Sequence, residues 1–216
     1  MQKLLLETYN LLSDHFGFRN WWPAETPFEV CVGAILTQNT SWKNVEKALY
    51  NLKQANKLNL TQILKTEDND LAELIRPSGY YNLKTKRLKA LCKYLSKHGT
   101  KDLTSFESLD TVTFRKQLLD VYGVGEETAD SILLYAFERK VFVIDAYTKR
   151  ISFRLGISKE DISYEKLQNL YVKHIPKDIS LYNDFHAQYV ALGSTFCKPK
   201  PLCKECPLNK ICEFAR

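Results

Sequence analysis

Apolar residues recur along this chain at intervals of three and four positions, the spacing that places them on one face of an α-helix. No stretch alternates apolar and polar residues for long enough to predict a β-strand, and the apolar run at 141–144 is short and unpaired. The pattern therefore predicts an all-α protein. The expected helices cover residues 2–12, 27–36, 45–52, 70–75, 88–95, 129–137, 146–155, 163–175 and 182–192.

Local signals mark where some of these helices start and stop. Thr26 is a capping residue, Pro27 suits the first helical position, and Glu29 stands three residues after the cap, which together predict a helix start. Pro77 is expected to end the helix before it. Residues 15–20 predict a loop, residues 51–69 one or two short helices, and residues 96–112 a loop with a short helical piece at most.

Two glycines flank one apolar residue between the helical patterns on either side of residues 121–125. In Gly123-Val124-Gly125 the missing Cβ atoms permit a tight turn and leave backbone N–H groups uncovered. A turn of this kind at the start of a helix can hold a phosphate.

The apolar run at 141–144 ends at Asp145, directly before an expected helix. Asp145 therefore suits the N-cap position, where its carboxylate would accept a backbone N–H. The positive end of the helix also keeps a carboxylate ionised, which suits a catalytic group. The two roles are compatible, and the pattern alone leaves both open. His186 lies on the apolar side of its helix, which favours a core histidine over a catalytic one.

Composition narrows the class of protein. The 216 residues are 44% apolar, enough for a core in one large domain or two small ones. No stretch is long and apolar enough to cross a bilayer, and no export signal is evident, so we expect a soluble cytoplasmic protein. The net charge of +6 and the pI near 8.9 suit a polyanionic partner. Basic residues crowd 84–93 and 198–210, and either group also fits a solvated face.

Four cysteines with the spacing C-x5-C-x2-C-x5-C follow the last expected helix, and they are Cys197, Cys203, Cys206 and Cys212. Disulfides are not expected in an intracellular protein, so the thiols indicate a metal site. Tetrahedral thiolate ligation fits zinc or an iron–sulfur cluster. A compact loop that closes on itself favours a [4Fe–4S] cluster over zinc. Cys31 and Cys92 lie on apolar helix faces and are expected in the core.

The glycine turn with Thr128-Ala129 after it, the segment Val143-Ile144-Asp145 and the cysteine loop together resemble the helix-hairpin-helix superfamily of base-excision DNA glycosylases, which includes endonuclease III. The resemblance covers most of the chain. It implies two helical domains with a DNA-binding cleft between them. The central domain would span 26–137, and the second would combine 1–25 with 138–216 and carry the cluster loop at 197–212. It also implies a catalytic Asp145 and phosphate binding by Gly123, Val124 and Gly125.

Two positions depart from that family. Bifunctional members carry a lysine that forms a Schiff base with the sugar and cleaves the strand, and the matching position here is Glu127. Because a carboxylate cannot form an imine, the resemblance implies a monofunctional enzyme that leaves an abasic site. The first cysteine interval has five residues where endonuclease III has six, which affects the path of the loop more than the cluster.

Three further segments resemble the bacterial 3-methyladenine DNA glycosylase III group: Trp21-Trp22-Pro23, residues 36–40 and residues 76–82. By position in that group, Trp21, Trp22 and Trp42 line the base pocket. Gln38 and Tyr80 would be wedges that fill the gap left by a flipped base. The plain alternatives are a tryptophan cluster in the core, a polar loop residue and a packed ring. Members of that group need not carry an iron–sulfur cluster, so the resemblance does not fix the substrate.

The expected function is removal of an alkylated purine such as 3-methyladenine from double-stranded DNA by a monomeric glycosylase. An electron-rich aromatic pocket suits cationic alkylated bases. One alternative is excision of an oxidised pyrimidine or of a mismatched uracil, thymine or adenine. Another is a DNA-damage-binding module without catalysis, although the presence of Asp145 argues against it.

Overall fold

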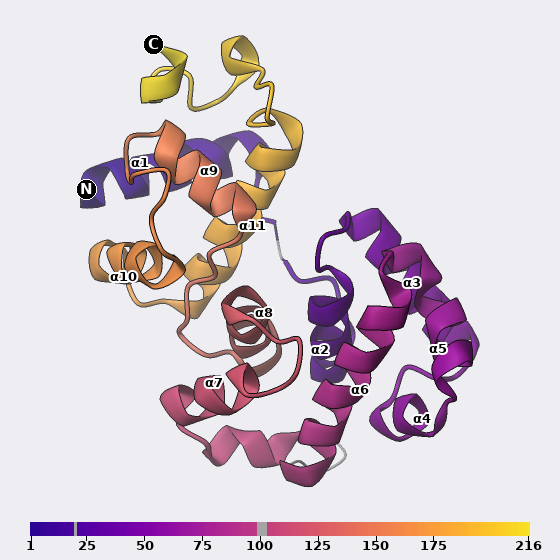
Figure 1. Ribbon diagram of the computed structural model, residues 1–216. Coiled ribbons are helices and arrows are strands. Elements are labelled where there is room, and N and C mark those ends of the chain that lie inside the picture. Colours follow the sequence, from indigo (N-terminus) through magenta and orange to yellow (C-terminus); the bar gives the residue numbers. More distant parts are fainter. Residues whose placement is uncertain (20, 99–102) are drawn as a thin grey trace. The chain divides into compact units, whose positions relative to one another are not determined.

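The computed structural model of this protein describes residues 1–19, 21–98 and 103–216 (Figure 1). Over these residues the fold is helical and contains no β-strand, which confirms the all-α prediction. The chain divides into two compact units. The terminal unit combines Met1–Pro23 with Lys140–Arg216, and the central unit is Ala24–Arg139.

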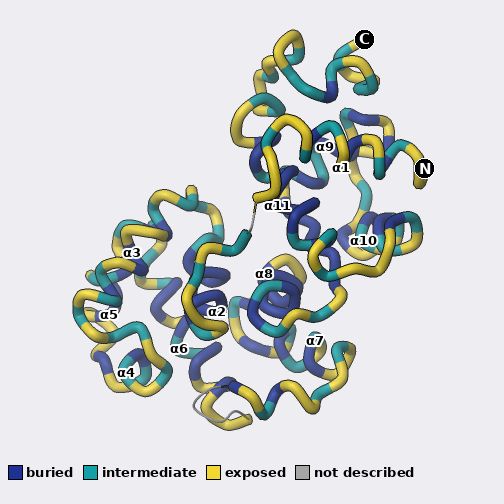
Figure 2. Tube along the Cα trace, turned by 180° about the vertical axis from the view of Figure 1, so that it is seen from behind, coloured by how far each residue is buried: buried dark blue, intermediate teal, exposed yellow. Residues whose placement is uncertain are grey.

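The central unit is built around α2 (Pro27–Leu36), in which every residue from Glu29 to Leu36 is buried (Figure 2). A helix this apolar on all sides needs neighbours on all sides. Helices α3, α6 and α8 and the segment after α8 pack against it. The other helices of the unit are α3 (Trp42–Gln54), α4 (Leu60–Lys65), α5 (Asp68–Ile75), α6 (Tyr81–His98), α7 (Thr111–Leu119) and α8 (Glu126–Ser131), with 3-10 turns at Arg76–Ser78 and Thr104–Ser108.

The helix after the glycine turn departs from the predicted geometry. α8 ends at Ser131, and the backbone continues as a π-helical segment, Ile132–Ala136. Wider turns of this kind are rare and occur often at functional sites. Ile132, Leu133, Leu134 and Ala136 are all buried in it. The apolar spacing predicted an α-helix because it does not report how many residues complete each turn of a short buried segment.

The terminal unit contains α1 (Gln2–Phe16), α9 (Ala146–Arg154), α10 (Tyr164–His174) and α11 (Ile179–Thr195). α11 packs against α1 and α9. The rings of Phe142 and Tyr171 are stacked, with a distance of 4.6 Å between their centroids. The run at 141–144 is buried but is not a strand. Side chains satisfy part of its backbone: Ile144 N donates to Tyr164 Oη at 3.3 Å, and Gln168 Nε2 donates to the Phe142 carbonyl at 2.8 Å.

Several helix boundaries differ from the predicted ones. α1 and α11 extend beyond the predicted 2–12 and 182–192: α1 continues to Phe16, and α11 begins after the N-cap Asp178, whose Oδ1 accepts the N–H of Leu181, and continues to Thr195. α6 reaches His98, inside the expected loop at 96–112, of which residues 99–102 lie outside the described residues. Asn20, at the end of the loop expected at 15–20, also lies outside them.

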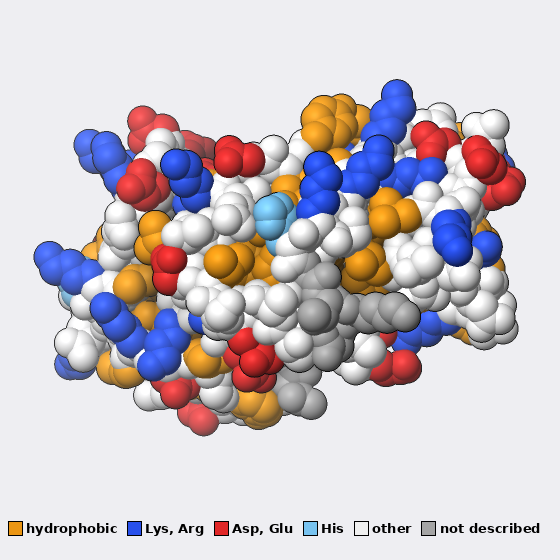
Figure 3. Space-filling view, turned by 90° about the horizontal axis from the view of Figure 1, so that it is seen from below, with side chains coloured by type: hydrophobic (Ala, Val, Ile, Leu, Met, Phe, Trp, Pro, Cys, Tyr) orange, Lys and Arg blue, Asp and Glu red, His pale blue; other side chains and the backbone are white. Residues whose placement is uncertain are grey.

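The surface mixes charge of both signs. On the face drawn in Figure 3, Lys and Arg side chains lie among acidic and apolar ones. In the described part of the chain, no helix combines the length and the apolar character required to cross a membrane.

Candidate functional site

Asp145 caps α9 in the terminal unit. Its backbone is extended, and its Oδ1 accepts the N–H of Thr148 at 2.6 Å, so the predicted N-cap is confirmed. The side chain is largely buried, with 9% of the residue exposed. The carboxylate thus lies at the positive end of a nine-residue helix, which favours its ionised form.

The second oxygen of Asp145 faces His186 on α11. Asp145 Oδ2 and His186 Nε2 are 3.6 Å apart, an ion-pair distance slightly longer than a hydrogen bond. Burial by itself would raise the pKa of Asp145, but His186 and the Thr148 amide outweigh it, and the pKa lies below its ordinary value. Asp145 is therefore a buried carboxylate held in its charged form.

His186 is buried, with 5% exposed, as the sequence predicted for a core histidine. Its contact with Asp145 was not predicted. The two residues belong to different helices, and 41 positions separate them in the sequence. The only signal available in advance was that a polar ring stood on an apolar helix face. That signal identifies no partner.

The glycine turn lies in the central unit between α7 and α8. Gly123 has a φ of +82°, which favours glycine, and a Cβ there would lie 2.2 Å from Arg87 Cγ. Arg87, on α6, therefore packs directly against the turn. Gly125 is the N-cap of α8 and is exposed, as are Glu126 and Glu127 after it.

Gln38, a predicted wedge, is held against this turn. Its Nε2 donates to the Gly123 carbonyl at 2.9 Å and to Thr128 Oγ1 at 3.0 Å, and its Oε1 accepts from Arg87 Nη1 at 2.6 Å. The amide is thus fixed at both ends, and Gln38 braces the turn in this conformation.

Tyr80, the second predicted wedge, stands between the 3-10 turn Arg76–Ser78 and α6. It has a φ of +47° and is 69% exposed. A positive φ is uncommon for residues other than glycine, and a bulky residue such as tyrosine in this backbone region calls for a functional explanation. The packed-ring alternative does not apply, because most of the side chain faces solvent.

The three tryptophans are divided between the two units. Trp21 and Trp22 belong to the terminal unit, where their ring centroids are 5.8 Å apart and both residues are half-buried. Trp42 is the first residue of α3 in the central unit and is also half-buried. The pairing of Trp21 with Trp22 is local, because the two residues are consecutive in the sequence, and Trp42 belongs to the other unit.

The cysteine loop follows α11 and is anchored to α9. Arg154 Nη1 donates to Cys197 Sγ at 3.2 Å and to the Lys198 carbonyl at 2.7 Å, while Arg150 Nε donates to the Cys197 carbonyl at 2.8 Å. Inside the loop, Asn209 Nδ2 donates to the Cys203 carbonyl at 2.8 Å. One helix thus carries Asp145 at its start and supports the loop from its later turns.

The four thiols lie near one another. Burial raises the pKa of Cys206, and its electrostatic interactions with the other three cysteines raise it further. In the described residues, no group of three or more His, Cys, Asp or Glu side chains is arranged to hold a metal ion. The fit to a metal group rests on the donor set: four neighbouring cysteines on one loop with a guanidinium beside Cys197.

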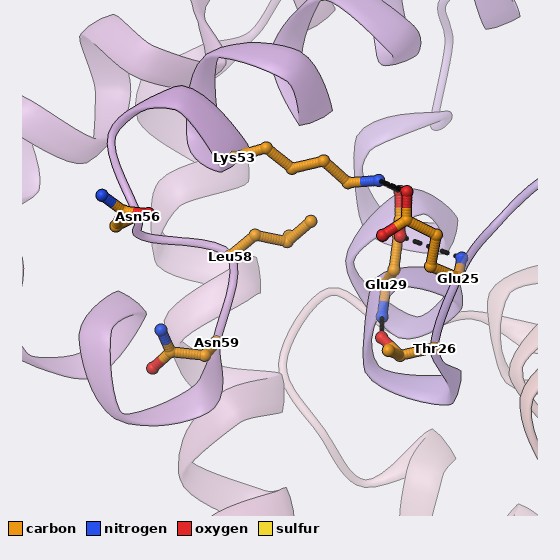
Figure 4. A pocket seen from close by; sticks show the side chains of 7 residues that line it. All are labelled: Glu25, Thr26, Glu29, Lys53, Asn56, Leu58 and Asn59. Atoms are coloured by element: carbon orange, nitrogen blue, oxygen red, sulfur yellow. Dashed lines mark hydrogen bonds and ion pairs between the residues drawn. The ribbon is translucent and has the colours of Figure 1, made fainter.

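A pocket lies beside the start of α2, and its polar lining includes the residues that cap this helix (Figure 4). Thr26 Oγ1 accepts the N–H of Glu29 at 3.1 Å, and the Glu29 carboxylate accepts the N–H of Glu25 at 3.0 Å. Lys53 Nζ pairs with Glu29 at 2.9 Å. The charged groups in the pocket therefore pair with each other, and the predicted helix start at Thr26 is confirmed.

The chain is similar to known proteins along nearly its whole length. The profile of the HhH-GPD superfamily of base excision DNA repair proteins matches residues 32–177. A Methanocaldococcus jannaschii protein provisionally named a DNA repair glycosylase is 47% identical over 97% of this chain and 96% of its own length. The endonuclease III of Thermotoga maritima is 33% identical over 88% of this chain and 84% of its own.

Two solved structures have a similar fold. The 3-methyladenine DNA glycosylase MagIII of H. pylori, bound to 1,N6-ethenoadenine, is 35% identical with a TM-score of 0.72, and the match covers 88% of this chain and 94% of that one. A complex of endonuclease III with DNA has a TM-score of 0.83 at 22% identity and covers 100% and 96% of the two chains, which supports the fold alone.

Proposed function

This chain belongs to the HhH-GPD superfamily of base excision DNA repair proteins and is a DNA glycosylase. We propose that it removes an alkylated purine such as 3-methyladenine and leaves an abasic site. The observation that carries this proposal is Asp145, a buried carboxylate whose pKa is held low at the start of α9. The likeness to the 3-methyladenine DNA glycosylase of H. pylori supports the choice of substrate.

Asp145 is proposed as the catalytic residue. As the N-glycosidic bond breaks, the sugar develops positive charge, and an ionised carboxylate stabilises that charge and orients the attacking water. The Thr148 amide and His186 hold the two oxygens of Asp145 in place. A group that is already ionised and oriented needs little rearrangement during the reaction.

Residues of the central unit are proposed to hold the DNA. The turn Gly123-Val124-Gly125 would bind a phosphate through its backbone N–H groups, which positions the duplex without reading its sequence. The exposed ring of Tyr80 supports its role as a wedge. Gln38 would reach the duplex by exchanging its contacts with Gly123, Thr128 and Arg87 for contacts with DNA.

The base pocket is proposed to be aromatic. Trp21 and Trp22 already form a pair, and Trp42 would complete the lining. Stacking and cation–π attraction favour a cationic alkylated purine over an ordinary base. Alkylation also weakens the glycosidic bond, so an enzyme of this kind needs less catalytic assistance than one that removes a normal base.

The enzyme is proposed to be monofunctional. Glu127 is exposed in the first turn of α8, and its carboxylate cannot form the imine through which a lysine would cleave the strand. The same side chain stabilises the helix N-terminus, which attracts negative charge.

Cys197, Cys203, Cys206 and Cys212 are proposed to bind a [4Fe–4S] cluster. When bound, such a group supplies a structural cross-link and is capable of one-electron transfer. The lysines of the loop, among them Lys198 and Lys204, would then face a phosphate backbone. We expect a brown protein that absorbs at roughly 400 nm, where thiolate-ligated iron–sulfur clusters absorb. A colourless preparation with stoichiometric zinc would contradict the proposal.

Incubation with methylated double-stranded DNA tests the activity of the protein, which we propose acts as a cytoplasmic monomer. Free 3-methyladenine should appear while the strands stay intact until alkali is added. Asp145→Asn should lower the rate of release by about 100-fold or more, because the developing charge loses its partner. Strand cleavage without alkali would contradict the monofunctional assignment.

The identity with the Thermotoga maritima endonuclease III favours one alternative, excision of an oxidised pyrimidine or a mismatched base. A panel of duplexes with one lesion each separates the two, because the released base identifies the substrate. A damage-binding module without catalysis is the remaining alternative. It would be favoured if neither the wild type nor Asp145→Asn released any base from the lesion duplexes, while Gly125→Asp lost DNA binding.

A further inference from the structure

Lys84 lies in the first part of α6 and is only 1% exposed, although its side chain ends in an ammonium group. Its Nζ donates to the carbonyl of Leu36 at 2.8 Å and to the carbonyl of Ser78 at 2.7 Å. Neither partner is a carboxylate. Burial, with Arg87 as the second cause, lowers the pKa of Lys84 to about 8. A buried charge without an opposite charge is costly, so packing alone does not explain the residue.

The two carbonyls belong to the two segments that carry the proposed wedges. Leu36 is the last residue of α2 and comes two positions before Gln38. Ser78 ends a 3-10 turn and comes two positions before Tyr80. One ammonium group therefore joins the bases of two loops that lie far apart in the sequence.

Arg87, one turn further along α6, extends this connection to the glycine turn. Its guanidinium donates to Gln38 Oε1 at 2.6 Å, and its aliphatic part packs so closely on Gly123 that a Cβ there would lie 2.2 Å away. Gln38 in turn donates to the Gly123 carbonyl at 2.9 Å. Three segments proposed to contact DNA thus converge on two side chains of one helix.

We propose that Lys84 is a positioning residue that sets the spacing between the Gln38 loop and the Tyr80 loop, so that both enter the duplex beside the same flipped nucleotide. This inference rests on the proposed function, which assigns the wedge roles to Gln38 and Tyr80. Because Lys84 is buried, it does not reach a phosphate itself. Its removal should impair extrusion of the base and leave binding to undamaged DNA unchanged.

Lys84→Met, which keeps an unbranched side chain one atom shorter than lysine and removes its N–H donors, tests the proposal. The single-turnover rate of base release should fall by about 10- to 100-fold, the effect of a small misplacement of groups that must act together. The fluorescence of 2-aminopurine placed beside the lesion rises as stacking is lost. On binding of Lys84→Met this fluorescence should rise less than on binding of the wild-type protein. Affinity for an undamaged duplex should stay within about twofold, because no phosphate contact is removed. Lys97→Met, at an exposed lysine near the end of α6, is the matched control and should behave as wild type.

A double-mutant cycle separates positioning from general destabilisation. In a Gln38→Ala/Tyr80→Ala background, Lys84→Met should reduce base release little further, because the loops it positions no longer carry wedges. An additive loss, a wild-type rate in the single variant, or an equal loss of undamaged-DNA binding would overturn the proposal. Circular dichroism checks folding. If Lys84→Met is unfolded, Lys84→Gln replaces it; its shorter, uncharged side chain still has an N–H donor, so base release should fall in the same direction by a smaller factor, and a wild-type rate would overturn the proposal.

Failure of the proposed function has a different signature. In that case the wild-type protein releases no base from any lesion duplex. The 2-aminopurine signal on a mismatched or abasic duplex would then still compare Lys84→Met with wild type. An unchanged signal there would overturn the role of Lys84, and a reduced signal would support it.

Discussion

At the scale of single residues, the candidate catalytic group is defined by its immediate neighbours. Asp145 would be a poor anion in an apolar interior without them, since burial raises the pKa of a carboxyl group. The Thr148 amide and His186 reverse that effect. His186 is thus more than a core residue, because together with Thr148 it lowers the pKa of the group that we propose to act on the sugar.

His186→Gln tests this relation through the pH dependence of kcat/KM. Because His186 lowers the pKa of Asp145, its loss raises that pKa, and activity should be lost at a higher pH as the solution is acidified. This loss forms the acidic limb of the pH profile, which should move to higher pH. The value of kcat/KM at pH values well above the limb should change little. His98→Gln, an exposed histidine at the end of α6, should keep the wild-type profile. An unshifted acidic limb in His186→Gln would show that the imidazole has no influence on Asp145.

At the scale of elements, the glycine turn owes its shape to two constraints at one position. Gly123 combines a φ of +82° with the packed side chain of Arg87, whereas Gly125 has a φ of −98° and open space around a Cβ. The two glycines look equivalent in the sequence. In the structure, only Gly123 of the two has a backbone conformation and a close neighbour that would make a larger side chain unfavourable.

Gly123→Ala should lower the free energy of unfolding by about 1–3 kcal/mol, the cost of a residue held in an unfavourable backbone region. The Cβ must also displace Arg87. Urea denaturation measures the change. Gly125→Ala is the matched control and should cost less, because a Cβ there would meet no atom within 4 Å. Equal losses at both positions would contradict the role of the close approach by Arg87.

Helix α9 connects the proposed catalytic carboxylate with the cysteine loop. Arg154 bonds Cys197 Sγ and the carbonyls of Lys198 and Pro199, and its guanidinium lies 4.7 Å from the ring of Phe214. Three of these contacts fix the path of residues 197–199 at the start of the loop, and the fourth joins Arg154 to Phe214, beyond the last cysteine. The loop is therefore organised by the helix as well as by whatever the cysteines bind.

Arg154→Ala should reduce the iron content per protein molecule and the absorbance at roughly 400 nm, because the loop loses the contacts that preorganise its ligands. It should also lower the thermal unfolding temperature. Lys149→Ala on the same helix is the control, since among the described residues its side chain forms no hydrogen bond or ion pair with the cysteine loop. Iron content equal to wild type in Arg154→Ala would mean that the cysteines alone determine the loop.

At the scale of the whole molecule, the proposed chemistry requires residues from both units. Asp145 belongs to the terminal unit, while Glu127 and the glycine turn belong to the central unit. The family match spans the junction between them, because it covers residues 32–177. The resemblance of position 127 to the lysine of bifunctional glycosylases, and not the placement of the two units, leads us to propose that position 127 and Asp145 address the same nucleotide.

Glu127→Lys tests that proposal. A lysine that reaches the sugar addressed by Asp145 should form an imine, which borohydride reduces to a stable protein–DNA bond, and the strand should be cut. Glu126→Lys, a substitution at the neighbouring exposed residue, should not be trapped. Trapping is measured on a denaturing gel with a labelled duplex that contains an abasic site. Equal trapping of both variants, or of neither, would contradict the assignment of position 127.

Features that depend on neighbouring residues could be predicted from the sequence. The caps at Thr26, Asp145 and Ser163 lie within three residues of the N–H groups they accept, so their patterns are visible locally. The helical core follows from the spacing of apolar residues. The π-helical segment Ile132–Ala136 could not be predicted, because burial on all sides leaves no periodicity to distinguish it.

The sequence by itself determined the all-α class, the capped helix starts at Thr26, Asp145 and Ser163, the glycine turn and the set of four cysteines, because each depends on residue types at short spacing. Only the tertiary structure decided which side chains meet across helices. His186 faces Asp145 across 41 positions, and Lys84 binds the Leu36 carbonyl across 48. Such contacts depend on how helices pack, and many packings are compatible with the same apolar pattern.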